Sequence, residues 1–253
     1  MTLDQASLKK DSFLLHQQAL YLSKPALQWD LFYKRNSNHF FKDRHWTTRE
    51  FPELSSSDPK HLLEVGCGSG SFLYPLLASY PNLTITAIDF SARAVDLVKE
   101  HPDFDPTRLS AFVADLSRPQ SLCPPVASSS MDIVSAIFVL SALHPDSLPT
   151  AFENIYSTLK PGGILLFRDY AQGDLAQKRF KEKSRIEGNL YHRQDGTLSL
   201  FFSLDDLQTL CDNSGFRILQ SEYVHKKVVN RKEALEMDRI WLQARIQKPL
   251  ESI

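Results

Sequence analysis

The run Leu62-Leu63-Glu64-Val65-Gly66-Cys67-Gly68-Ser69-Gly70 joins a short apolar segment to three closely spaced glycines. A strand that ends in a glycine-rich turn and opens a helix is a common way to hold a nucleotide-like ligand. The glycines permit a sharp turn and let the ligand approach the backbone, which side chains would block. This run therefore predicts the first strand and the ligand-binding turn of an α/β domain.

A second apolar run, Leu83-Thr84-Ile85-Thr86-Ala87-Ile88, ends at Asp89. A carboxylate at the end of the second strand is placed to accept hydrogen bonds from ribose hydroxyls. The glycine spacing is G-x-G-x-G, whereas dinucleotide folds use G-x-G-x-x-G to bring a helix N-terminus onto a pyrophosphate. With Glu64 before it, the pattern resembles that of methyltransferases that use S-adenosylmethionine (SAM). We therefore expect SAM as the cofactor.

The composition excludes several classes of protein. The 253 residues carry a formal net charge of −1, with 42% hydrophobic and 23% charged residues, as in ordinary globular domains. Binding of nucleic acid would therefore need a local patch or a partner. Three cysteines without C-x-x-C spacing argue against a disulfide framework or a zinc site. We expect no metal, no membrane contact and a cytoplasmic location, with the nucleus as the alternative, because no signal peptide or apolar span is recognisable.

From about residue 60 the pattern alternates strands and helices, which predicts a parallel sheet with right-handed crossovers. The expected fold is α/β and Rossmann-like, with a mostly parallel seven-stranded sheet that ends in an antiparallel pair. Lys160-Pro161-Gly162-Gly163 is expected to interrupt the chain after a helix, and residues 117–130 to form a surface loop. Strands are expected at 62–65, 84–88, 109–113, 131–139, 164–167, 216–224 and 239–246, and helices at 72–79, 92–100, 148–159 and 204–214.

Two segments lie outside this minimal sheet. Residues 1–58 are expected to form an N-terminal helical cap that also binds RNA, and residues 171–203 an insertion within the SAM-binding domain of residues 59–253. Additions over the carboxyl ends of the strands form the ligand crevice of an α/β fold. We therefore expect these two segments to determine the substrate.

The N-terminal segment interleaves aromatic and basic side chains. Aromatic faces beside cations are typical of single-stranded RNA recognition, in which bases stack on rings and cations meet phosphates. An amphipathic cap that packs its rings on the sheet and leaves its charges in solvent is the alternative. The segment reads Trp29-Asp30-Leu31-Phe32-Tyr33-Lys34-Arg35-Asn36, then Phe40-Phe41-Lys42-Asp43-Arg44-His45-Trp46, then Glu50-Phe51-Pro52-Glu53-Leu54.

Together with the glycine run, this segment resembles the methyltransferase-like enzymes that make N3-methylcytidine in tRNA. The resemblance covers roughly residues 28–248 and includes four further motifs: Phe138-Val139-Leu140-Ser141-Ala142-Leu143-His144-Pro145, Phe167-Arg168-Asp169-Tyr170, Tyr191-His192-Arg193-Gln194-Asp195-Gly196-Thr197, and the tail from Glu222-Tyr223 to Val229-Asn230. It implies a class I methyltransferase fold, SAM as methyl donor, and cytidine 32 of the anticodon loop of serine or threonine tRNA as the target. The short N-terminus resembles the branch that acts on serine tRNA, in which seryl-tRNA synthetase is a partner.

By motif position, the resemblance also implies a SAM site. Trp29 and Tyr33 share one helix face and could close over the cofactor with their rings toward the sulfonium, although packing of the cap is the alternative. Gly66 leaves room for the methionine moiety, and Asp89 accepts from the ribose. Asp115 is assigned to accept from the adenine amino group, and Leu116 and Ile137 are assigned as apolar walls of the site.

Methyl transfer to cytidine N3 needs no general base, because this atom already carries a lone pair. The enzyme must place N3 of an unpaired or extruded base in line with the sulfonium methyl. The product is a cation, which a carboxylate near the base would favour. Asp169, flanked by Arg168 and Tyr170, is the catalytic candidate, and an Arg168–Asp169 pair that only braces the strand end is the alternative. We expect Asp169→Ala to abolish turnover and to leave SAM affinity within a few-fold.

Basic side chains are the expected substrate contacts. Lys34, Arg35, Lys42, Arg44 and Arg193 are assigned to the RNA backbone. His144 precedes a proline, which indicates a turn residue rather than a catalytic one. The insertion adds a basic group for which a solvated face is the alternative: Lys178, Arg179, Lys181, Lys183 and Arg185.

Three functions remain open from the sequence. One is a tRNA cytidine N3-methyltransferase, and another is a SAM-dependent methyltransferase of a protein or small molecule, in which the aromatic–basic segment is only a lid. The third is a non-enzymatic module that binds SAM together with tRNA or a synthetase. The glycine turn with Asp89 and Asp115 argues against the third, and failure to bind tRNA would favour the second. We expect the first.

Overall fold

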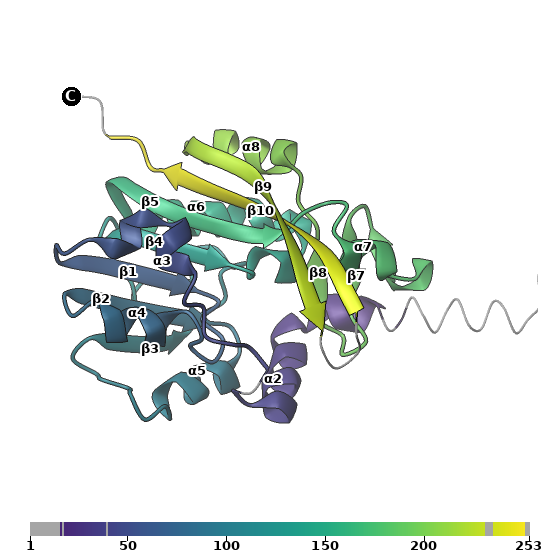
Figure 1. Ribbon diagram of the computed structural model, residues 1–253, viewed down its shortest axis with the longest axis horizontal. Coiled ribbons are helices and arrows are strands. Elements are labelled where there is room, and N and C mark those ends of the chain that lie inside the picture. Colours follow the sequence, from purple (N-terminus) through teal and green to yellow (C-terminus); the bar gives the residue numbers. More distant parts are fainter. Residues whose placement is uncertain (1–15, 17, 39, 231–234, 251–253) are drawn as a thin grey trace, which may run out of the picture.

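The glycine run lies next to the central strand of a seven-stranded sheet, whose order is β3-β2-β1-β4-β5-β10-β9. The computed structural model in Figure 1 describes residues 16, 18–38, 40–230 and 235–250. The predicted Rossmann-like sheet with a terminal antiparallel pair is confirmed. The parallel strands are β1 (Lys60–Val65), β2 (Leu83–Asp89), β3 (Leu109–Val113), β4 (Met131–Ile137) and β5 (Leu159–Tyr170), and the antiparallel strands are β9 (Arg217–Asn230) and β10 (Leu235–Gln247).

Helices cover both faces of the sheet, because alternate strand residues point to opposite sides and both sides are apolar. In β1, Leu62 packs into one hydrophobic cluster, and Leu63 and Val65 pack into the other. The Leu62 side is covered by α3 (Thr47–Glu50), η1 (Pro52–Ser55), α4 (Leu73–Ser79) and α5 (Ala92–Lys99), and the other side by α6 (Leu148–Thr158) and α8 (Leu204–Asn213).

Most predicted boundaries agree with the structure to within two residues. Ser91 caps α5 as its side chain accepts a hydrogen bond from the amide of Ala94, and Gly215 follows α8 with a positive φ of 74°. One prediction is wrong: Lys160-Pro161-Gly162-Gly163 ends the helix but continues as extended chain, so β5 begins at Leu159. A register shift between β4 and β5 accommodates these residues.

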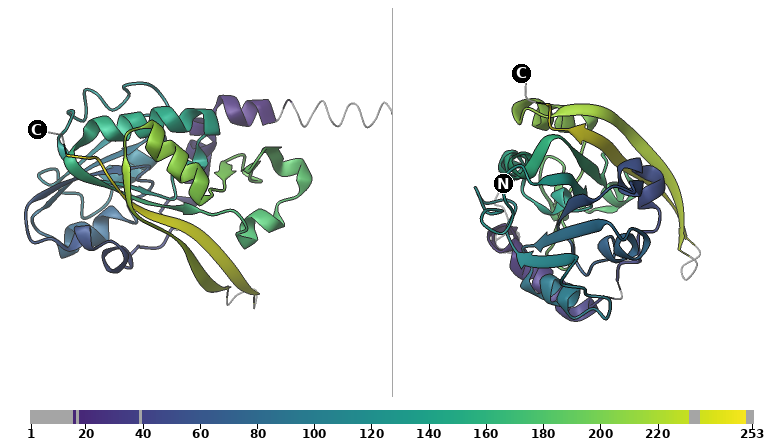
Figure 2. Two further views of the ribbon diagram at one scale, coloured as in Figure 1. Left: turned by 90° about the horizontal axis from the view of Figure 1, so that it is seen from above. Right: turned by 90° about the vertical axis from the view of Figure 1, so that its left-hand side faces the viewer.

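The antiparallel pair is much longer than predicted. β10 pairs with β5 from Trp241 onward, and beyond it the two strands continue as a free hairpin, here called the arm (residues 225–230 and 235–240). Figure 2 shows the arm leaving the body of the sheet. On β9 its side chains His225, Lys226 and Lys227 are exposed, so this part of the sequence shows no apolar alternation that would predict a longer strand.

The insertion at 171–203 folds into its own small unit, which the sequence did not predict. It contains α7 (Leu175–Arg179), η4 (Glu182–Ser184) and a three-stranded antiparallel sheet of β6 (Arg185–Glu187), β7 (Leu190–His192) and β8 (Leu198–Leu200). Figure 1 shows this unit at the same end of the main sheet as the arm and helix α2 (Pro25–Asn36). The insertion thus lies beside the carboxyl ends of the parallel strands.

Part of the predicted N-terminal cap, residues 1–15, lies outside the described residues. Helix α2 packs against α5 through Phe32, Tyr33 and Ala94. Two short turns, η2 (Leu140–Ala142) and η3 (Pro145–Ser147), follow β4. Among the described residues, no helix is long and apolar enough to cross a membrane, and no group of three metal-ligating side chains is found.

Candidate active site

A pocket of about 510 Å³ lies at the carboxyl ends of β1, β2 and β4, under helix α2. Its position follows from the topology, since parallel strands end at one edge and the ligand crevice forms there. The wall is mostly apolar, with one carboxylate and two aromatic side chains from α2. Its lining residues are Trp29, Tyr33, Gly66, Ile88, Asp89, Phe90, Ala114, Leu116, Phe138, Val139, Ala142 and Leu143.

The glycine turn gives the pocket its shape. Gly66, Gly68 and Gly70 have φ values of 64°, 54° and 88°, a region that side-chain-bearing residues rarely adopt. A Cβ atom on Gly66 would overlap the side chain of Val139, and one on Gly68 would lie 2.6 Å from the hydroxyl of Tyr33. Glycine is therefore required both by the backbone conformation and by the close approach of the Val139 and Tyr33 side chains.

Asp89 is buried at the end of β2 and joins the turn to helix α5. Its carboxylate accepts hydrogen bonds of 2.9 Å each from the amides of Gly68 and Ser91. Burial raises the pKa of Asp89 to about 6, although the two amides oppose this shift. A carboxylate has further lone pairs, so it can also accept from the hydroxyls of a ribose in the pocket.

Helix α2 forms the roof of the pocket. Asp30 fixes it to α5 by accepting from the hydroxyl of Ser91 at 2.6 Å and from the amide of Arg93 at 3.2 Å. The indole nitrogen of Trp29 is buried at the pocket and has no hydrogen-bond partner among the described residues. An unpaired donor, a glycine cradle and an apolar wall fit SAM, whose cation can face the two aromatic rings and whose adenine needs apolar surfaces.

The structure does not bring all seven predicted cofactor residues to the pocket wall. Trp29, Tyr33, Gly66, Asp89 and Leu116 line it, whereas Asp115 and Ile137 lie just outside. The carboxylate of Asp115 accepts from the amide and hydroxyl of Ser117 and pairs with Arg118 at 3.1 Å, within its own turn. The carbonyl of Ile137 accepts from Arg44 at 2.9 Å. Their contacts with SAM stay predictions.

Asp169 is fully buried and does not line the pocket. Its two oxygens accept hydrogen bonds of 2.9 Å from the amides of Ser141 and Tyr170, which fixes turn η2 against the end of β5. Burial raises the pKa of Asp169 to about 6, against the opposing effect of these hydrogen bonds. Ala142 and Leu143 follow Ser141 and line the pocket, so Asp169 holds the turn that forms part of the pocket wall, and its predicted catalytic contact stays a prediction.

Arg168 points to the opposite face of β5 and does not pair with Asp169. Its guanidinium lies 4.2 Å from the ring centre of Trp46 and 4.8 Å from that of Trp241, and its side chain is buried. Burial lowers the pKa of Arg168 to about 10, and the carboxylates of Glu50 and Glu222 oppose this shift. Neither the predicted catalytic contact nor the alternative Arg168–Asp169 pair matches this geometry, because Arg168 instead fixes Trp46 to the sheet.

Arg44 is half-buried beside the end of β4 instead of lying free on the surface. Its guanidinium donates to the carbonyl of Ile137 and lies 5.5 Å from the ring centre of Phe138. Burial lowers the pKa of Arg44, and the buried carboxylate of Glu64 opposes the shift. The predicted phosphate contact of Arg44 would require it to leave these partners. By contrast, Lys34, Arg35 and Lys42 are exposed on and after α2.

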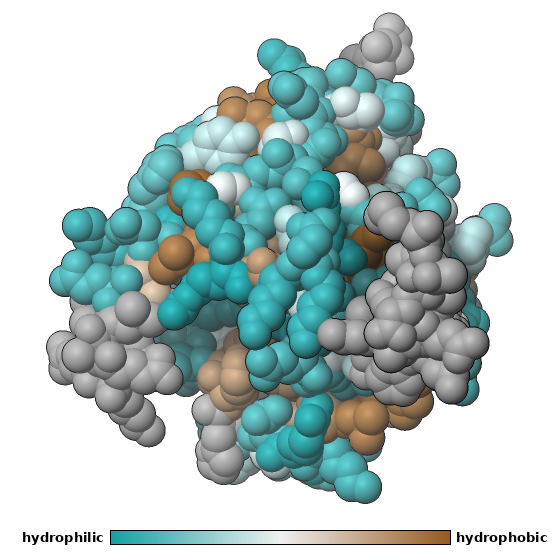
Figure 3. All heavy atoms as spheres, turned by 90° about the vertical axis from the view of Figure 1, so that its right-hand side faces the viewer, coloured by the Kyte–Doolittle hydropathy of each residue, from teal (hydrophilic) through white to brown (hydrophobic). Residues whose placement is uncertain are grey.

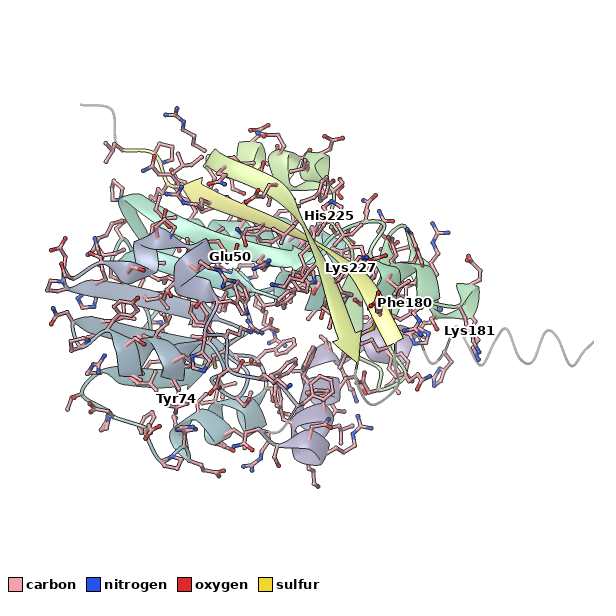
Figure 4. The ribbon with its side chains drawn as sticks, in the orientation of Figure 1. Glu50, Tyr74, Phe180, Lys181, His225 and Lys227 are labelled. Carbon is pink, nitrogen blue, oxygen red and sulfur yellow. The ribbon has the colours of Figure 1, made fainter. Side chains whose placement is uncertain are left out.

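A second, larger cavity of about 1530 Å³ opens between the insertion and the arm, and we call it the basic cavity. Figure 4 labels Phe180 and Lys181 on the insertion and Lys227 on the arm. The face that carries these two elements is mostly hydrophilic (Figure 3). The lining residues are Tyr21, Tyr170, Leu175, Ala176, Arg179, Phe180, Lys181, Lys183, Ser184, His192, Arg193, Gln194, Ser199, Met237 and Arg239.

The basic cavity combines predicted and unpredicted residues. Arg193 lines it but is half-buried, since its guanidinium also donates to Ser199 at 3.1 Å and lies 5.6 Å from the ring centre of Tyr170. Arg179, Lys181 and Lys183 also line it, whereas Lys178 and Arg185 do not. His144 occupies a turn, where its ring accepts from the amide of Asp146, and it contacts Glu187 at 3.0 Å.

Phe138 and Arg239 are the main site residues that the sequence reasoning missed. Phe138 directly follows β4 with a positive φ of 57°, a conformation uncommon outside glycine, and its amide donates to the carbonyl of Arg168 at 2.7 Å. Its ring centre lies 5.2 Å from that of Tyr170, so a residue that lines the pocket contacts one that lines the basic cavity. Phe138 is the first residue of the family motif that runs to Pro145, and this motif could have indicated it as a site residue. Arg239 had no such signal.

Comparison with known proteins gives one family and several relatives. Residues 33–221 match the family model described as "Methyltransferase domain". The human protein named "tRNA N(3)-cytidine methyltransferase METTL6" is 46% identical, over 97% of this chain and 89% of its own length. The Schizosaccharomyces pombe protein named "tRNA N(3)-methylcytidine methyltransferase trm141" is 44% identical, over 88% of this chain and 92% of its own. A solved SAM-dependent methyltransferase from Anabaena variabilis superimposes with a TM-score of 0.65 at 12% identity, over 88% of this chain and 94% of that one.

Proposed function

Because this chain belongs to the family of tRNA N(3)-cytidine methyltransferases, we propose that it methylates N3 of cytidine 32 in the anticodon loop of serine tRNA, using SAM. The single observation that supports the RNA substrate best is the pairing of two cavities. An apolar pocket that fits SAM adjoins a cavity lined by five lysine and arginine side chains. A small apolar substrate would not need the second cavity.

The boundary between the two cavities is where the target base would lie. Phe138 lines the SAM pocket and Tyr170 lines the basic cavity, with ring centres 5.2 Å apart. Aromatic rings at this position can stack on an unpaired base and hold its Watson–Crick edge toward the pocket. The cations around Tyr170 can then meet the phosphates that flank the base.

SAM supplies an electrophilic methyl group when it is bound. The residues of this chain contribute position rather than proton transfer, since N3 of cytidine is already nucleophilic. Helix α2 excludes water from above through Trp29 and Tyr33, and Asp89 holds the glycine turn. Asp169 fixes turn η2 and the amide of Tyr170, and therefore fixes the aromatic boundary. Alignment of the two reactants is the main source of rate in such a reaction.

The charge of the product supports this arrangement. N3-methylcytidine is a cation, and two buried carboxylates, Asp89 and Asp169, lie at the strand ends near the pocket. At neutral pH both are mostly ionised, because burial raises each pKa only to about 6. Fixed negative charge close to the reacting base lowers the energy of the developing cation.

The assignment to serine tRNA and to seryl-tRNA synthetase as a partner rests on the sequence resemblance and on charge. A formal net charge of −1 provides little general attraction for tRNA, so the cations of one cavity must act locally. A partner that already holds the tRNA would offset this weak attraction. We also propose that the protein works in the cytoplasm.

The test is nucleoside mass spectrometry of tRNA after incubation with the protein and SAM, with and without seryl-tRNA synthetase. We expect N3-methylcytidine in serine tRNA, in larger amount when the synthetase is present. A transcript with uridine at position 32 is the matched control and should gain no methyl group. Normal SAM binding without methylation of any tRNA would contradict the proposal and would favour a protein or small-molecule substrate.

A further inference from the structure

Three guanidinium groups and three aromatic rings alternate from the N-terminal segment to the insertion. Successive members are separated by 4.2 to 5.9 Å between guanidinium carbon and ring centre. Stacked guanidinium groups keep their orientation and are less strongly hydrated than lysine ammonium groups. The order is Trp46, Arg168, Trp241, Arg239, Tyr170 and Arg193.

Arg168 does not line the basic cavity, and both terminal nitrogens of Arg193 donate within the protein, so the free donors of this series belong to Arg239. Its Nε donates to both oxygens of Asp174, at 3.1 and 3.0 Å, and its side chain is 20% exposed. Neither terminal nitrogen has a hydrogen-bond partner within the described part of the chain. Since Arg239 lines the basic cavity, these donors are available to a ligand there. A fork of free N–H groups matches the geometry of a phosphate.

Asp174 determines where that fork lies. Its carboxylate is fully buried and also accepts from the amide of Ala176 at 2.6 Å and from that of Ile240 at 2.7 Å. One carboxylate therefore joins the insertion, the arm and the Arg239 guanidinium. A salt bridge alone could serve only to hold the arm. However, Arg239 pairs with Asp174 only through Nε, and its two terminal nitrogens stay available to the basic cavity. A bridge that only held the arm would not need these two donors to stay free.

We propose that Arg239 binds a backbone phosphate next to the target nucleotide and that Asp174 is its positioning residue. This inference rests on the proposed function and deepens it, because it assigns a phosphate contact to the arm. The guanidinium carbons of Arg239 and Arg193 each lie 5.6 Å from the ring centre of Tyr170. A phosphate bound by Arg239 would therefore lie beside the boundary that Phe138 and Tyr170 form. A phosphate fixed here would hold the nucleotide while its base reaches the SAM pocket.

The test measures tRNA affinity as a function of salt, together with kcat and KM, on an unmodified serine tRNA transcript. For Arg239→Gln we expect KM to rise about tenfold, and the slope of log affinity against log salt to fall by about 0.7 to 0.9, the effect of one lost phosphate contact. For Asp174→Asn we expect KM to rise and the slope to fall in the same direction, because Arg239 keeps its charge but no longer directs its terminal nitrogens at the phosphate. SAM affinity should stay within twofold in both variants, which shows that the fold is intact.

Arg217→Gln is the matched control, since Arg217 is exposed on β9 at the end of the hairpin remote from the cavity. It should change neither KM nor slope. The inference is overturned if Arg239→Gln behaves like this control, or if it raises KM with an unaltered slope, as a purely structural bridge would. If the wild-type protein forms no N3-methylcytidine, the proposed function fails instead. If the wild-type protein and Arg239→Gln methylate the tRNA equally well, only the phosphate contact is rejected and the proposed function stands.

Discussion

The SAM pocket and the basic cavity lie side by side but are built in opposite ways. The pocket is formed by helix α2, the glycine turn and the segments that follow neighbouring parallel strands, and its wall is mostly apolar side chains. The basic cavity combines Tyr21, the insertion and the arm, which are distant in sequence, and its lining is rich in cations. The cofactor site therefore depends on backbone shape, whereas the substrate site depends on how charged side chains are held.

The largest expected effect is a loss of SAM affinity when the backbone shape of the glycine turn is changed. In Gly66→Ala the new methyl group would overlap Val139, and the backbone would be strained at a φ of 64°. We expect SAM affinity to fall by about a hundredfold or more, since a strained φ and a clash each cost roughly 1–3 kcal/mol. Isothermal titration calorimetry with SAM measures this loss.

Gly188→Ala is the control for this substitution. Gly188 also has a positive φ, of 44°, but no atom lies within 4 Å of a Cβ placed there, in the turn between β6 and β7. The two variants share backbone strain and differ in the clash and the location. SAM affinity should be unchanged in Gly188→Ala. An equal loss in both would show that the pocket does not depend on the local shape of its turn.

The next effect concerns the boundary between the two regions. Asp169→Ala leaves the amides of Ser141 and Tyr170 without their acceptor, at a cost of about 1–3 kcal/mol for each buried group. We expect kcat to fall about a hundredfold or more, because the aromatic boundary loses its position. SAM affinity should stay within a few-fold.

Asp169→Asn is the conservative comparison, since one oxygen remains as an acceptor. It should recover part of kcat, which rapid-quench measurement of methyl transfer would detect. Loss of SAM binding in Asp169→Ala would contradict the view that Asp169 aligns the target base without contributing to cofactor binding. It would show that turn η2 supports the cofactor pocket as much as the boundary.

The difference between the regions also explains what could be predicted from sequence. Five of the seven residues that the family resemblance assigns to SAM line the pocket. The sheet and the succession of strands and helices followed from short-range patterns: the apolar runs of β1 and β2, the glycine spacing, and Asp89 at a strand end. Such signals are local because a strand and its turn are contiguous in the chain.

The substrate region gave weaker signals. Arg44 and Arg168 look like exposed cations in the sequence, but aromatic rings from distant elements bury or flank them. Charge alone does not reveal a cation–π partner, because the ring comes from another strand or segment. The arm and the Asp174–Arg239 pair were missed for the same reason, since their two residues meet only through the fold.

A smaller effect tests whether the insertion provides phosphate contacts. Arg179 lines the basic cavity and the adjacent Lys178 does not, although both lie in α7 and are exposed. We expect Arg179→Gln to raise KM for tRNA about three- to tenfold, the net effect of one ordinary hydrogen bond, since Arg179 is exposed to solvent, and to leave SAM affinity unchanged. Lys178→Gln should leave both quantities unaltered. Equal rises in KM would indicate that only total charge matters and that the cavity does not select its contacts.

The smallest effect is a pH dependence of SAM binding. Burial raises the pKa of Asp89 to about 6, so this carboxyl takes up a proton as pH falls through that value. A protonated carboxyl accepts fewer hydrogen bonds from a ribose, and binding should therefore weaken toward acid pH. If only the ionised form binds, the Kd for SAM should rise about fourfold between pH 7.5 and 5.5. Asp89→Asn should bind more weakly at neutral pH and should lack this dependence, whereas Asp169→Asn should retain it. A flat profile in the wild-type protein would show that Asp89 acts only on the amides of Gly68 and Ser91, and that the pocket recognises its ligand by shape alone.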